Sequence, residues 1–332
     1  MRAAVLRRFG APLEVGELPD PTPGPGEALV RVRAVGICGT DLKITSGAFS
    51  TTPLPIVPGH EVAGELASPV EGMAPGQRVA CYVYDPCGTC LWCRLGQDTL
   101  CPASRRIGFD RDGGLAEYVV VPARNLLPFG EGLPFELAGV AMDAVTAPWR
   151  ALVRRAAVRA GETVVVGGAG GLGLSGVQIA RSLGARVAAI DPVASHRDLA
   201  VEVGAELAVA PDDVDRVRAW AGEGADVGFE ASGSREGFLA VLATLRPGGR
   251  LVCCGYRPGL EYGLDSARLV LGEITLLGSR NGSREDARAA LRAVEEGKVR
   301  PRVMERLPLA EVNRALELLR AGDVRGRVVV CP

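Results

Sequence analysis

The pattern of hydrophobic and polar positions predicts strands in the first part of the chain and alternating strands and helices further on. Apolar and polar residues alternate within Ala28–Val35, and Val62–Leu66 and Gly114–Pro122 continue this extended pattern. Phe135–Val140 begins a helix that leads into the apolar segment around Asp143. The first part is therefore predicted to consist mainly of β-strands.

One stretch, Thr163–Pro192, carries the strongest signal. Its β-branched run Thr163–Val166 is typical of a strand buried on both faces. Glycines follow at once with the spacing G-x-G-x-x-G, at Gly168, Gly170 and Gly173. In this context the glycines predict a turn whose backbone can closely approach a pyrophosphate.

A helix is expected directly after this glycine turn. Apolar residues from Leu174 to Leu183 give it a buried face, and Gly184 ends it. Arg186–Ile190 then predicts a second strand, which ends at Asp191, about 20 residues after the turn. The helix N-terminus would bind the pyrophosphate and the acid would accept hydrogen bonds from ribose hydroxyls, so the stretch predicts dinucleotide binding.

The remaining pattern completes a sheet of six strands. The further strands are predicted at Glu206–Ala210, Asp226–Ala231, Arg250–Gly255 and Glu273–Gly278. Six strands suffice for a doubly wound parallel sheet. Two later helices, Arg284–Glu296 with Ser283 as its cap and Val312–Leu319, precede a short strand at Val328–Val330.

Composition narrows the class of protein. The chain has 332 residues, enough for two domains, and a net charge of −1, which provides no field to attract nucleic acid or an anionic membrane. Thr163–Ala180 is uncharged, but its six glycines argue for a soluble core rather than a membrane span. Met1–Asp20 lacks the apolar region of a signal peptide. We therefore expect a cytoplasmic protein without nucleic-acid or membrane partners.

Four of the nine cysteines form a compact motif, C-x2-C-x2-C-x7-C, made by Cys87, Cys90, Cys93 and Cys101. Four thiolates on a loop match a closed tetrahedral zinc site, which is structural because it leaves no position for a substrate. The alternative is an iron–sulfur cluster, for which the last gap is longer than in the usual ferredoxin motif. Zinc is the preferred interpretation.

Three other residues are singled out one by one as candidate site residues. Cys38 and His60 each adjoin a predicted strand, where a rigid scaffold can hold them. Asp143 lies in an apolar segment, and a carboxylate is costly to bury unless it is paired or binds metal. The other histidine, His196, lies in a polar run and is interpreted as a surface residue.

Several motifs in one order make the chain resemble the zinc-containing alcohol dehydrogenases of the medium-chain dehydrogenase/reductase family. The motifs are GICGTDL at 36–42, PGHEVAGEL at 58–66, the four-cysteine segment, DGGLAEYVV at 112–120, GGAGGLGL at 167–174 and VRGRVVV at 324–330. The resemblance covers nearly the whole length. It implies an α/β fold, with a mostly-β, GroES-like catalytic domain and a Rossmann domain with a doubly wound parallel sheet.

The same resemblance implies the domain limits. Residues 1–147 would form the catalytic domain, with a structural-zinc lobe at about 81–110. Residues 148–283 would bind NAD, and residues 284–332 would return to the catalytic domain. In this family the active site lies in the cleft between the two domains. We also expect a homo-oligomer, either a dimer or a tetramer.

Residue roles follow from the resemblance by position. Cys38 and His60 match ligands of a catalytic zinc, and Glu61 matches an acid that can approach that metal. Thr40 matches the hydroxyl that bonds the substrate oxygen, and Asp41 the acid that orients the ligand histidine. Arg327 matches an arginine near the cofactor pyrophosphate. The expected cofactor-binding residues are thus Gly168, Gly170, Gly171, Leu172, Gly173, Asp191 and Arg327.

The sequence departs from the family pattern at two positions. Asp143 stands where many members have a cysteine as the third zinc ligand, a choice also found in secondary-alcohol dehydrogenases. Lys43 stands where many members have a histidine that relays the substrate proton. We interpret Asp143 as the third ligand and advance the hypothesis that Lys43 replaces the relay histidine.

The expected function is zinc-dependent hydride transfer between an alcohol and NAD, giving a ketone or an aldehyde. A secondary alcohol is the first expectation for the substrate, and a polyol or sugar is the alternative. A zinc-independent quinone-type reductase or a nucleotide-binding protein without turnover would explain the glycine turn but not the candidate ligands. Asp191 predicts NAD rather than NADP, because a carboxylate repels a 2′-phosphate.

Overall fold

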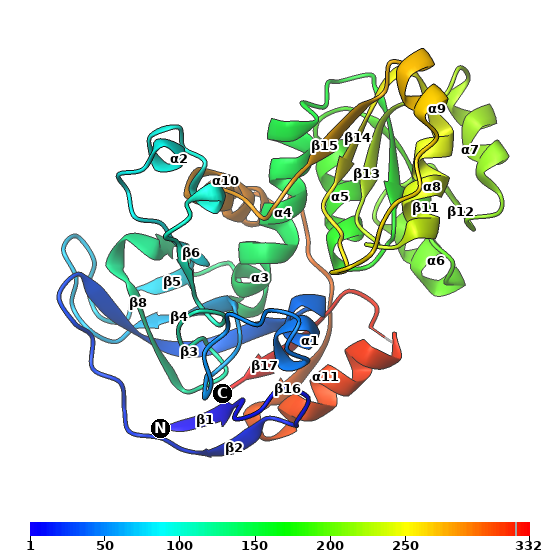
Figure 1. The fold of residues 1–332 in the computed structure, drawn as a ribbon. Coiled ribbons are helices and arrows are strands. Elements are labelled where there is room, and N and C mark those ends of the chain that lie inside the picture. Colours follow the sequence, from blue (N-terminus) through cyan, green and yellow to red (C-terminus); the bar gives the residue numbers. More distant parts are fainter. Residues whose placement is uncertain (323) are drawn as a thin grey trace. The chain divides into compact units, whose positions relative to one another are not determined.

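The computed structural model describes residues 1–322 and 324–332, which form two compact units. The first unit comprises Met1–Asp143, Gly282–Glu296 and Pro301–Pro332, and the second comprises Ala144–Asn281 and Gly297–Arg300. Figure 1 shows both, coloured along the sequence. Segments from both ends of the chain thus build the first unit. The function of each unit is still a prediction.

The strands of the first unit dominate its architecture. They are β1 Arg2–Val5, β2 Glu14–Glu17, β3 Glu27–Ile37, β4 Glu61–Leu66, β5 Arg78–Cys81, β6 Tyr84–Asp85, β7 Arg105–Arg106, β8 Tyr118–Pro122, β9 Leu126–Pro128, β16 Val303–Pro308 and β17 Arg327–Cys331. Its helices are α1 Gly39–Thr45, α2 Leu91–Arg94, α3 Phe135–Val140, α10 Arg284–Glu295 and α11 Val312–Ala321. Short 3₁₀ turns lie at η1 Asp98–Leu100, η2 Ala123–Asn125 and η5 Leu309–Glu311.

A seven-stranded sheet forms the centre of the first unit. Its order is β16-β17-β3-β4-β5-β9, with β8 also paired to β3. The C-terminal β17, red in Figure 1, lies antiparallel to β3 near the start of the chain. The long β3 pairs in turn with β4. The ends of these neighbouring strands bring distant parts of the sequence together.

The second unit alternates strands and helices. Its strands are β10 Thr163–Gly167, β11 Arg186–Ile190, β12 Leu207–Val209, β13 Ala225–Glu230, β14 Leu245–Cys253 and β15 Thr275–Gly278. Its helices are α4 Thr146–Trp149, α5 Gly171–Ser182, α6 Ala194–Glu202, α7 Val214–Ala221, α8 Arg235–Thr244 and α9 Ser266–Leu271, and the π-helical segment η4 covers Arg150–Arg155.

All six strands of the second unit are parallel, in the order β12-β11-β10-β13-β14-β15. Every residue of the central strand β10 is buried, as its β-branched sequence predicted. The order reverses next to β10, which is the position where doubly wound sheets bind dinucleotides. The predicted mixed fold, a mostly-β unit and a parallel-sheet unit, is confirmed.

Two strands begin four or five residues away from their predicted starts, more than any other. β8 begins at Tyr118, because Gly113 and Gly114 pack against another backbone segment: a Cβ at Gly113 would lie 2.2 Å from the Gly59 oxygen. β14 begins at Leu245, before the predicted Arg250, and its register shifts along β13. In both cases packing between distant segments decided the boundary.

Within the described residues, every helix is too short or too polar to cross a membrane.

Candidate active site and cofactor site

Three predicted ligands converge in the first unit. Cys38 follows β3, and His60 directly precedes β4, the antiparallel neighbour of β3. The Cys38 Sγ lies 3.3 Å from the His60 Nε2, and the Asp143 Oδ2 lies 3.8 Å from each of these atoms. Cys38 and His60 are buried, whereas 16% of the Asp143 side chain is exposed. A thiolate, an imidazole and a carboxylate therefore meet at one point.

A local irregularity of the helix positions Asp143. The α-helix α3 ends at Val140, and a π-helical segment, Ala141–Val145, carries the aspartate. Such segments widen a helix by one residue and occur frequently at functional sites. The sequence pattern predicted the helix but not this change, which has no simple periodic signature.

Asp41 holds both Cys38 and His60 in place. It is the third residue of α1, and its Oδ2 accepts a hydrogen bond from the Cys38 N–H at 2.8 Å. Its Oδ1 lies 3.3 Å from the His60 Nδ1, on the side of the ring away from Cys38. A carboxylate at Nδ1 fixes the orientation of an imidazole whose Nε2 binds metal.

The loop that carries His60 is fixed by backbone packing. Gly113 and Gly114 donate hydrogen bonds to the carbonyls of Val57 and Gly59. A Cβ at Gly108 would lie 2.7 Å from the Gly59 oxygen, so a side chain there would separate the two segments. This close approach gives a physical reason for the glycines of the PGH and DGG motifs.

Glu61 and Arg327 form a buried ion pair beside the three ligands. The Arg327 guanidinium lies 3.0 Å from the Glu61 Oε1 and 3.8 Å from the Asp143 Oδ2. Gly36 on β3 makes room for Glu61, because a Cβ there would lie 2.0 Å from its Oε2. Burial raises the pKa of Glu61, and the charge of Arg327 opposes that shift. The resemblance predicts Arg327 near the cofactor, and nothing in the sequence pattern predicts this pairing with Glu61.

The electrostatic environment keeps the Asp143 carboxylate ionised. Burial by itself would raise the pKa of the Asp143 carboxyl. Contacts with His60 and the charge of Arg327 lower this pKa by a larger amount, so the net shift is downward. For His60, burial by itself would lower the pKa. The charges of Asp41 and Cys38 raise it, and the net shift of this pKa is well upward. Several negative groups thus surround this point, as expected where a cation binds.

The donors fit a zinc ion. Sulfur, nitrogen and oxygen atoms separated by 3.3–3.8 Å match the edges of a tetrahedron with zinc bonds of about 2.0–2.3 Å. The Glu61 oxygens are buried without hydrogen bonds among the described residues, and Glu61 belongs to the same cluster of potential ligands. Three ligands would leave one coordination position for a substrate, and Glu61 could approach the same ion.

Thr40 and Lys43 lie on α1, the helix that Cys38 caps. The Thr40 N–H donates to the Cys38 Sγ at 3.2 Å, which places this residue against a candidate ligand. Lys43 follows one turn later and is partly exposed. The helix therefore places Thr40 against the candidate metal site and carries Lys43 three residues further on.

The four-cysteine motif also folds into a cluster, on the loop that contains α2. The sulfur atoms of Cys87, Cys90, Cys93 and Cys101 all lie within 4.8 Å of one another. The Cys90 and Cys93 sulfurs are 3.5 Å apart. Backbone N–H groups of Thr89 and Cys90 lower the pKa of the Cys87 thiol to about 6, which favours the thiolate that binds zinc.

The glycine turn of the second unit has the features of a phosphate site. Gly168 has a φ of +84°, and a Cβ at Gly173 would lie 1.7 Å from the Gly168 oxygen. No described atom lies within 4 Å of the position that a Cβ would occupy at Gly170. The first residues of α5, Gly171 and Leu172, carry N–H groups without acceptors inside the helix. These residues fit an anionic pyrophosphate.

Asp191 directly follows β11 beside this turn, close to its predicted position, and it contacts several neighbouring groups. Its Oδ2 accepts from the Ala169 N–H at 2.7 Å, and its Oδ1 accepts from the Val193 N–H at 2.8 Å. The His196 Nδ1 lies 3.3 Å from the same Oδ1, and 15% of that side chain is exposed. The interpretation of His196 as a surface residue is therefore wrong. α6 turns this histidine back toward the acid, which a polar run cannot reveal.

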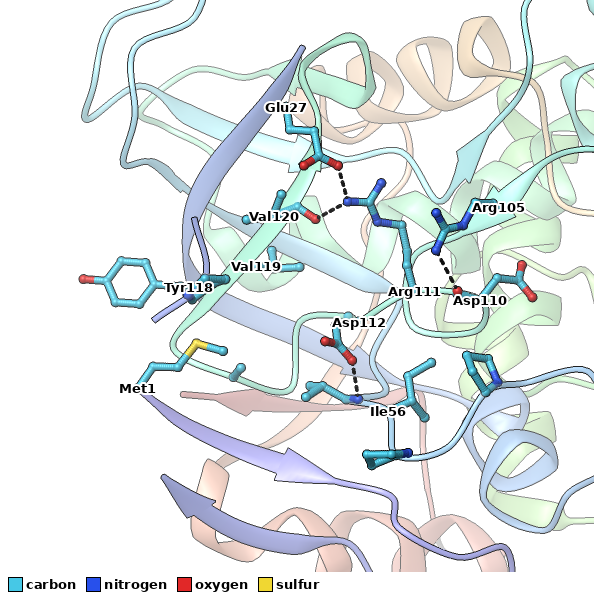
Figure 2. Close-up of a pocket in the computed structure, with 16 residues that line it drawn as sticks. Met1, Glu27, Ile56, Arg105, Asp110, Arg111, Asp112, Tyr118, Val119 and Val120 are labelled. Carbon is cyan, nitrogen blue, oxygen red and sulfur yellow. Dashed lines mark hydrogen bonds and ion pairs between the residues drawn. The ribbon is translucent and has the colours of Figure 1, made fainter. Parts of the chain in front are cut away.

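A separate pocket of about 390 Å³ lies on the first unit, between Met1, the Pro53–Val57 segment and β8 (Figure 2). A charge pair between Arg111 and Glu27 closes one end, with 2.6 Å between the two side chains. Asp112 lines the pocket and accepts from the Val57 N–H. None of the residues predicted to act in catalysis or to bind metal or cofactor lines this pocket.

Comparison with known proteins agrees with this geometry. Residues 24–131 match the model of the alcohol dehydrogenase GroES-like domain, and residues 171–296 match that of the zinc-binding dehydrogenases. The chain belongs to this family. An alcohol dehydrogenase of Geobacillus stearothermophilus is 35% identical to it, over 99% of both chains.

Solved structures of the zinc dehydrogenase family share the whole fold. An NAD-dependent alcohol dehydrogenase superposes with a TM-score of 0.93 at 35% identity, over 100% of both chains. A cobalt- and zinc-bound thermostable alcohol dehydrogenase from Pyrobaculum aerophilum has a TM-score of 0.91 at 32% identity, with coverage of 100% of this chain and 99% of that one. The predicted family, the GroES-like and Rossmann folds, and NAD and zinc as cofactors are confirmed.

Proposed function

We propose that this NAD-dependent zinc alcohol dehydrogenase oxidises secondary alcohols to ketones and that Cys38, His60 and Asp143 hold its catalytic metal. One observation carries the proposal: the Asp143 carboxylate lies 3.8 Å from both the Cys38 Sγ and the His60 Nε2. Zinc in this position supplies a Lewis acid that makes an alcohol easier to deprotonate. The four-cysteine lobe holds a second, structural zinc.

The side chains around the metal site bind and orient the reacting groups. The Thr40 hydroxyl accepts the proton of the alcohol and holds the substrate oxygen. Asp41 fixes the ring of His60, as the 3.3 Å separation supports. The pair of Glu61 and Arg327 compensates charge beside the ligands, since a buried carboxylate needs a partner.

Lys43 passes the proton from Thr40 to solvent. Its position three residues after Thr40 on α1 supports this role, and its partial exposure gives it access to water. A lysine relays protons only when its pKa falls toward the working pH, and a nearby metal cation has this effect because it disfavours the ammonium form. An ammonium that contacts only the cofactor is the competing role.

The cofactor binds to the second unit. The N–H groups at the start of α5 bind the pyrophosphate, and Asp191 accepts hydrogen bonds from the adenosine ribose. Arg327, predicted from the resemblance to lie near the pyrophosphate, keeps that role in the proposal, and its contacts with Glu61 and Asp143 support a second role beside the metal site.

A substrate panel tests the proposal. Purified protein is given NAD with secondary alcohols, primary alcohols, polyols and sugars, and the absorbance of NADH is followed while zinc is counted by elemental analysis. We expect about two zinc ions per chain and the highest kcat/KM for a secondary alcohol. A higher kcat/KM for polyols would overturn the substrate class, and the absence of any NAD reduction would overturn the activity.

Cofactor choice is tested at Asp191. We expect the wild type to use NAD at least about tenfold better than NADP, because the carboxylate repels a 2′-phosphate. Asp191→Ser removes this charge and should narrow the ratio, while zinc content stays unchanged. A wild type that prefers NADP would contradict the assignment.

The oligomeric state and the cellular location of the protein are also proposals. We propose a homo-oligomer, a dimer or a tetramer, in the cytoplasm. Light scattering coupled to size exclusion measures the mass in solution, and a monomer at micromolar concentration would contradict the first part.

A further inference from the structure

A second buried acid, Glu230, lies at the carboxyl end of the parallel sheet and has no part in the reaction as described so far. It is the last residue of β13, and none of its surface is exposed. Its Cα is paired with Gly167, which leads into the glycine turn, and with Cys253 at the end of β14. Glu230 therefore lies at the centre of the sheet edge where doubly wound folds bind dinucleotides.

Among the described residues, the groups that donate hydrogen bonds to this carboxylate are all neutral. Its Oε1 accepts hydrogen bonds from the Ser232 N–H at 2.8 Å, from the Gly233 N–H at 3.0 Å and from the Ser232 hydroxyl. The Glu230 backbone carbonyl accepts from the N–H groups of Cys254 and Gly255. These dipoles hydrogen-bond the carboxylate, but no cationic side chain in the described part of the chain pairs with it, in contrast to Glu61, which pairs with an arginine.

The neighbouring titratable groups supply no compensating charge either. Burial and, to a smaller extent, the charge of Glu230 together raise the pKa of Cys253 to about 12. Burial and the same charge raise the pKa of Tyr262 to about 12. Both groups are neutral in the working range. Burial also raises the pKa of Glu230 itself, against the hydrogen bonds from Ser232 and Gly233.

The order of the strands indicates which half of the cofactor lies nearer to the Glu230 charge. The glycine turn after β10 and Asp191 after β11 belong to the half-sheet that binds the adenosine side. β13, β14 and β15 form the other half-sheet, which faces the nicotinamide side. Glu230 ends the first strand of that half. The nicotinamide ring carries a positive charge in NAD⁺ and none in NADH.

We propose that the buried charge of Glu230 shifts the binding preference of the site toward NAD⁺ relative to NADH. This inference rests on the proposed NAD site and adds a determinant of selectivity between the two redox forms. Glu230 does not touch the reacting atoms: it acts at a distance, through its charge and through the loop that it holds. An anion near the ring stabilises the cationic form and leaves the neutral form nearly unaffected.

Direct binding of the two redox forms tests the proposal. Glu230→Gln keeps a carbonyl oxygen that can accept the three bonds now made to Oε1, but removes the charge. Dissociation constants for NAD⁺ and NADH are measured by calorimetry at about pH 8, well above the usual range of carboxyl groups. For charges ~10 Å apart in a partly polar environment, we expect the ratio of the two constants to shift roughly fivefold toward NADH.

A matched control lies at the opposite end of the same strand. Asp226 is partly buried at the start of β13 and pairs with Arg246 at 2.8 Å. Asp226→Asn also removes one carboxylate from β13, but from the edge away from the cofactor. It should change stability and leave the NAD⁺/NADH ratio as in the wild type. Glu230→Asp, which restores the charge, should recover most of the wild-type ratio.

The possible outcomes distinguish a failure of the Glu230 proposal from a failure of the proposed function. If Glu230→Gln weakens both forms by the same factor, the residue only supports the loop and the inference is overturned. If neither form binds the wild type, the proposed function itself fails. Should Glu230→Gln not fold, Ser232→Lys brings a cation to the carboxylate from an exposed position and should shift the ratio in the same direction. An unchanged ratio in that variant also overturns the proposal.

Discussion

The two candidate metal sites of the first unit are built in opposite ways. The four-cysteine cluster comes from one loop, in which Cys87 and Cys101 are 14 residues apart, and Cys87 is exposed. The other site joins Cys38 and Asp143 across 105 residues, and Cys38 and His60 are buried beneath the sheet ends. One site forms wherever its loop can fold, whereas the other exists only when the whole unit has assembled.

This difference corresponds to the two roles. Four thiolates fill the coordination of zinc and offer nothing to a substrate, so the exposed lobe is suited to stabilise structure. Three unlike ligands leave a position open, and Glu61 lies ready in the same cluster. The number and type of donors, together with the way each site is assembled, therefore distinguish the predicted structural site from the predicted catalytic one.

The variant Asp143→Ala should have the largest effect on turnover. Removal of the third ligand should release the catalytic zinc and lower kcat on the order of 10³-fold, because Lewis-acid stabilisation is worth several kcal/mol. Elemental analysis should find about one zinc per chain, and NAD affinity should be retained.

Asp143→Cys serves as the matched variant, since a thiolate is also a zinc ligand and should restore zinc content. If Asp143→Ala instead retained two zinc ions and nearly normal activity, Glu61 would be the third ligand.

Replacement of Lys43 by methionine should have an intermediate effect. Met keeps the apolar stem and removes the amine, so the loss of a proton relay should lower kcat roughly ten- to hundredfold and change its pH profile. Zinc content should stay at two, which separates this variant from Asp143→Ala. Unchanged turnover combined with weaker NAD binding would assign Lys43 to the cofactor.

Cys90→Ser should have the smallest effect on turnover and the clearest effect on stability. The variant should lose about one zinc per chain and unfold at a temperature roughly 10 °C lower, while the folded fraction keeps its kcat within about twofold. Differential scanning calorimetry with zinc analysis measures both. A folded variant that still contained two zinc ions would contradict the structural-zinc assignment, and a large loss of kcat would remove the contrast between the sites.

The sequence predicted the local parts of this protein well. The glycine turn with β10, α5 and β11, and the four-cysteine motif, each depend on neighbouring residues, and their geometry follows from short-range sterics and donor spacing. The resemblance to a known family is what matched Cys38, His60 and Asp143 to the ligands of one zinc ion. Chain pattern by itself gave no reason to bring these three together.

Only the tertiary structure decided which distant groups meet. The π-helical turn at Asp143 arises from a change in helical pitch, and the pairing of Glu61 with Arg327 arises from packing between segments far apart in the sequence. Sequence periodicity reports which face of an element is buried, but not what it is buried against. The charges of buried groups depend on those partners, so the sequence determined the elements and their local motifs, and the packing determined the chemistry of the site.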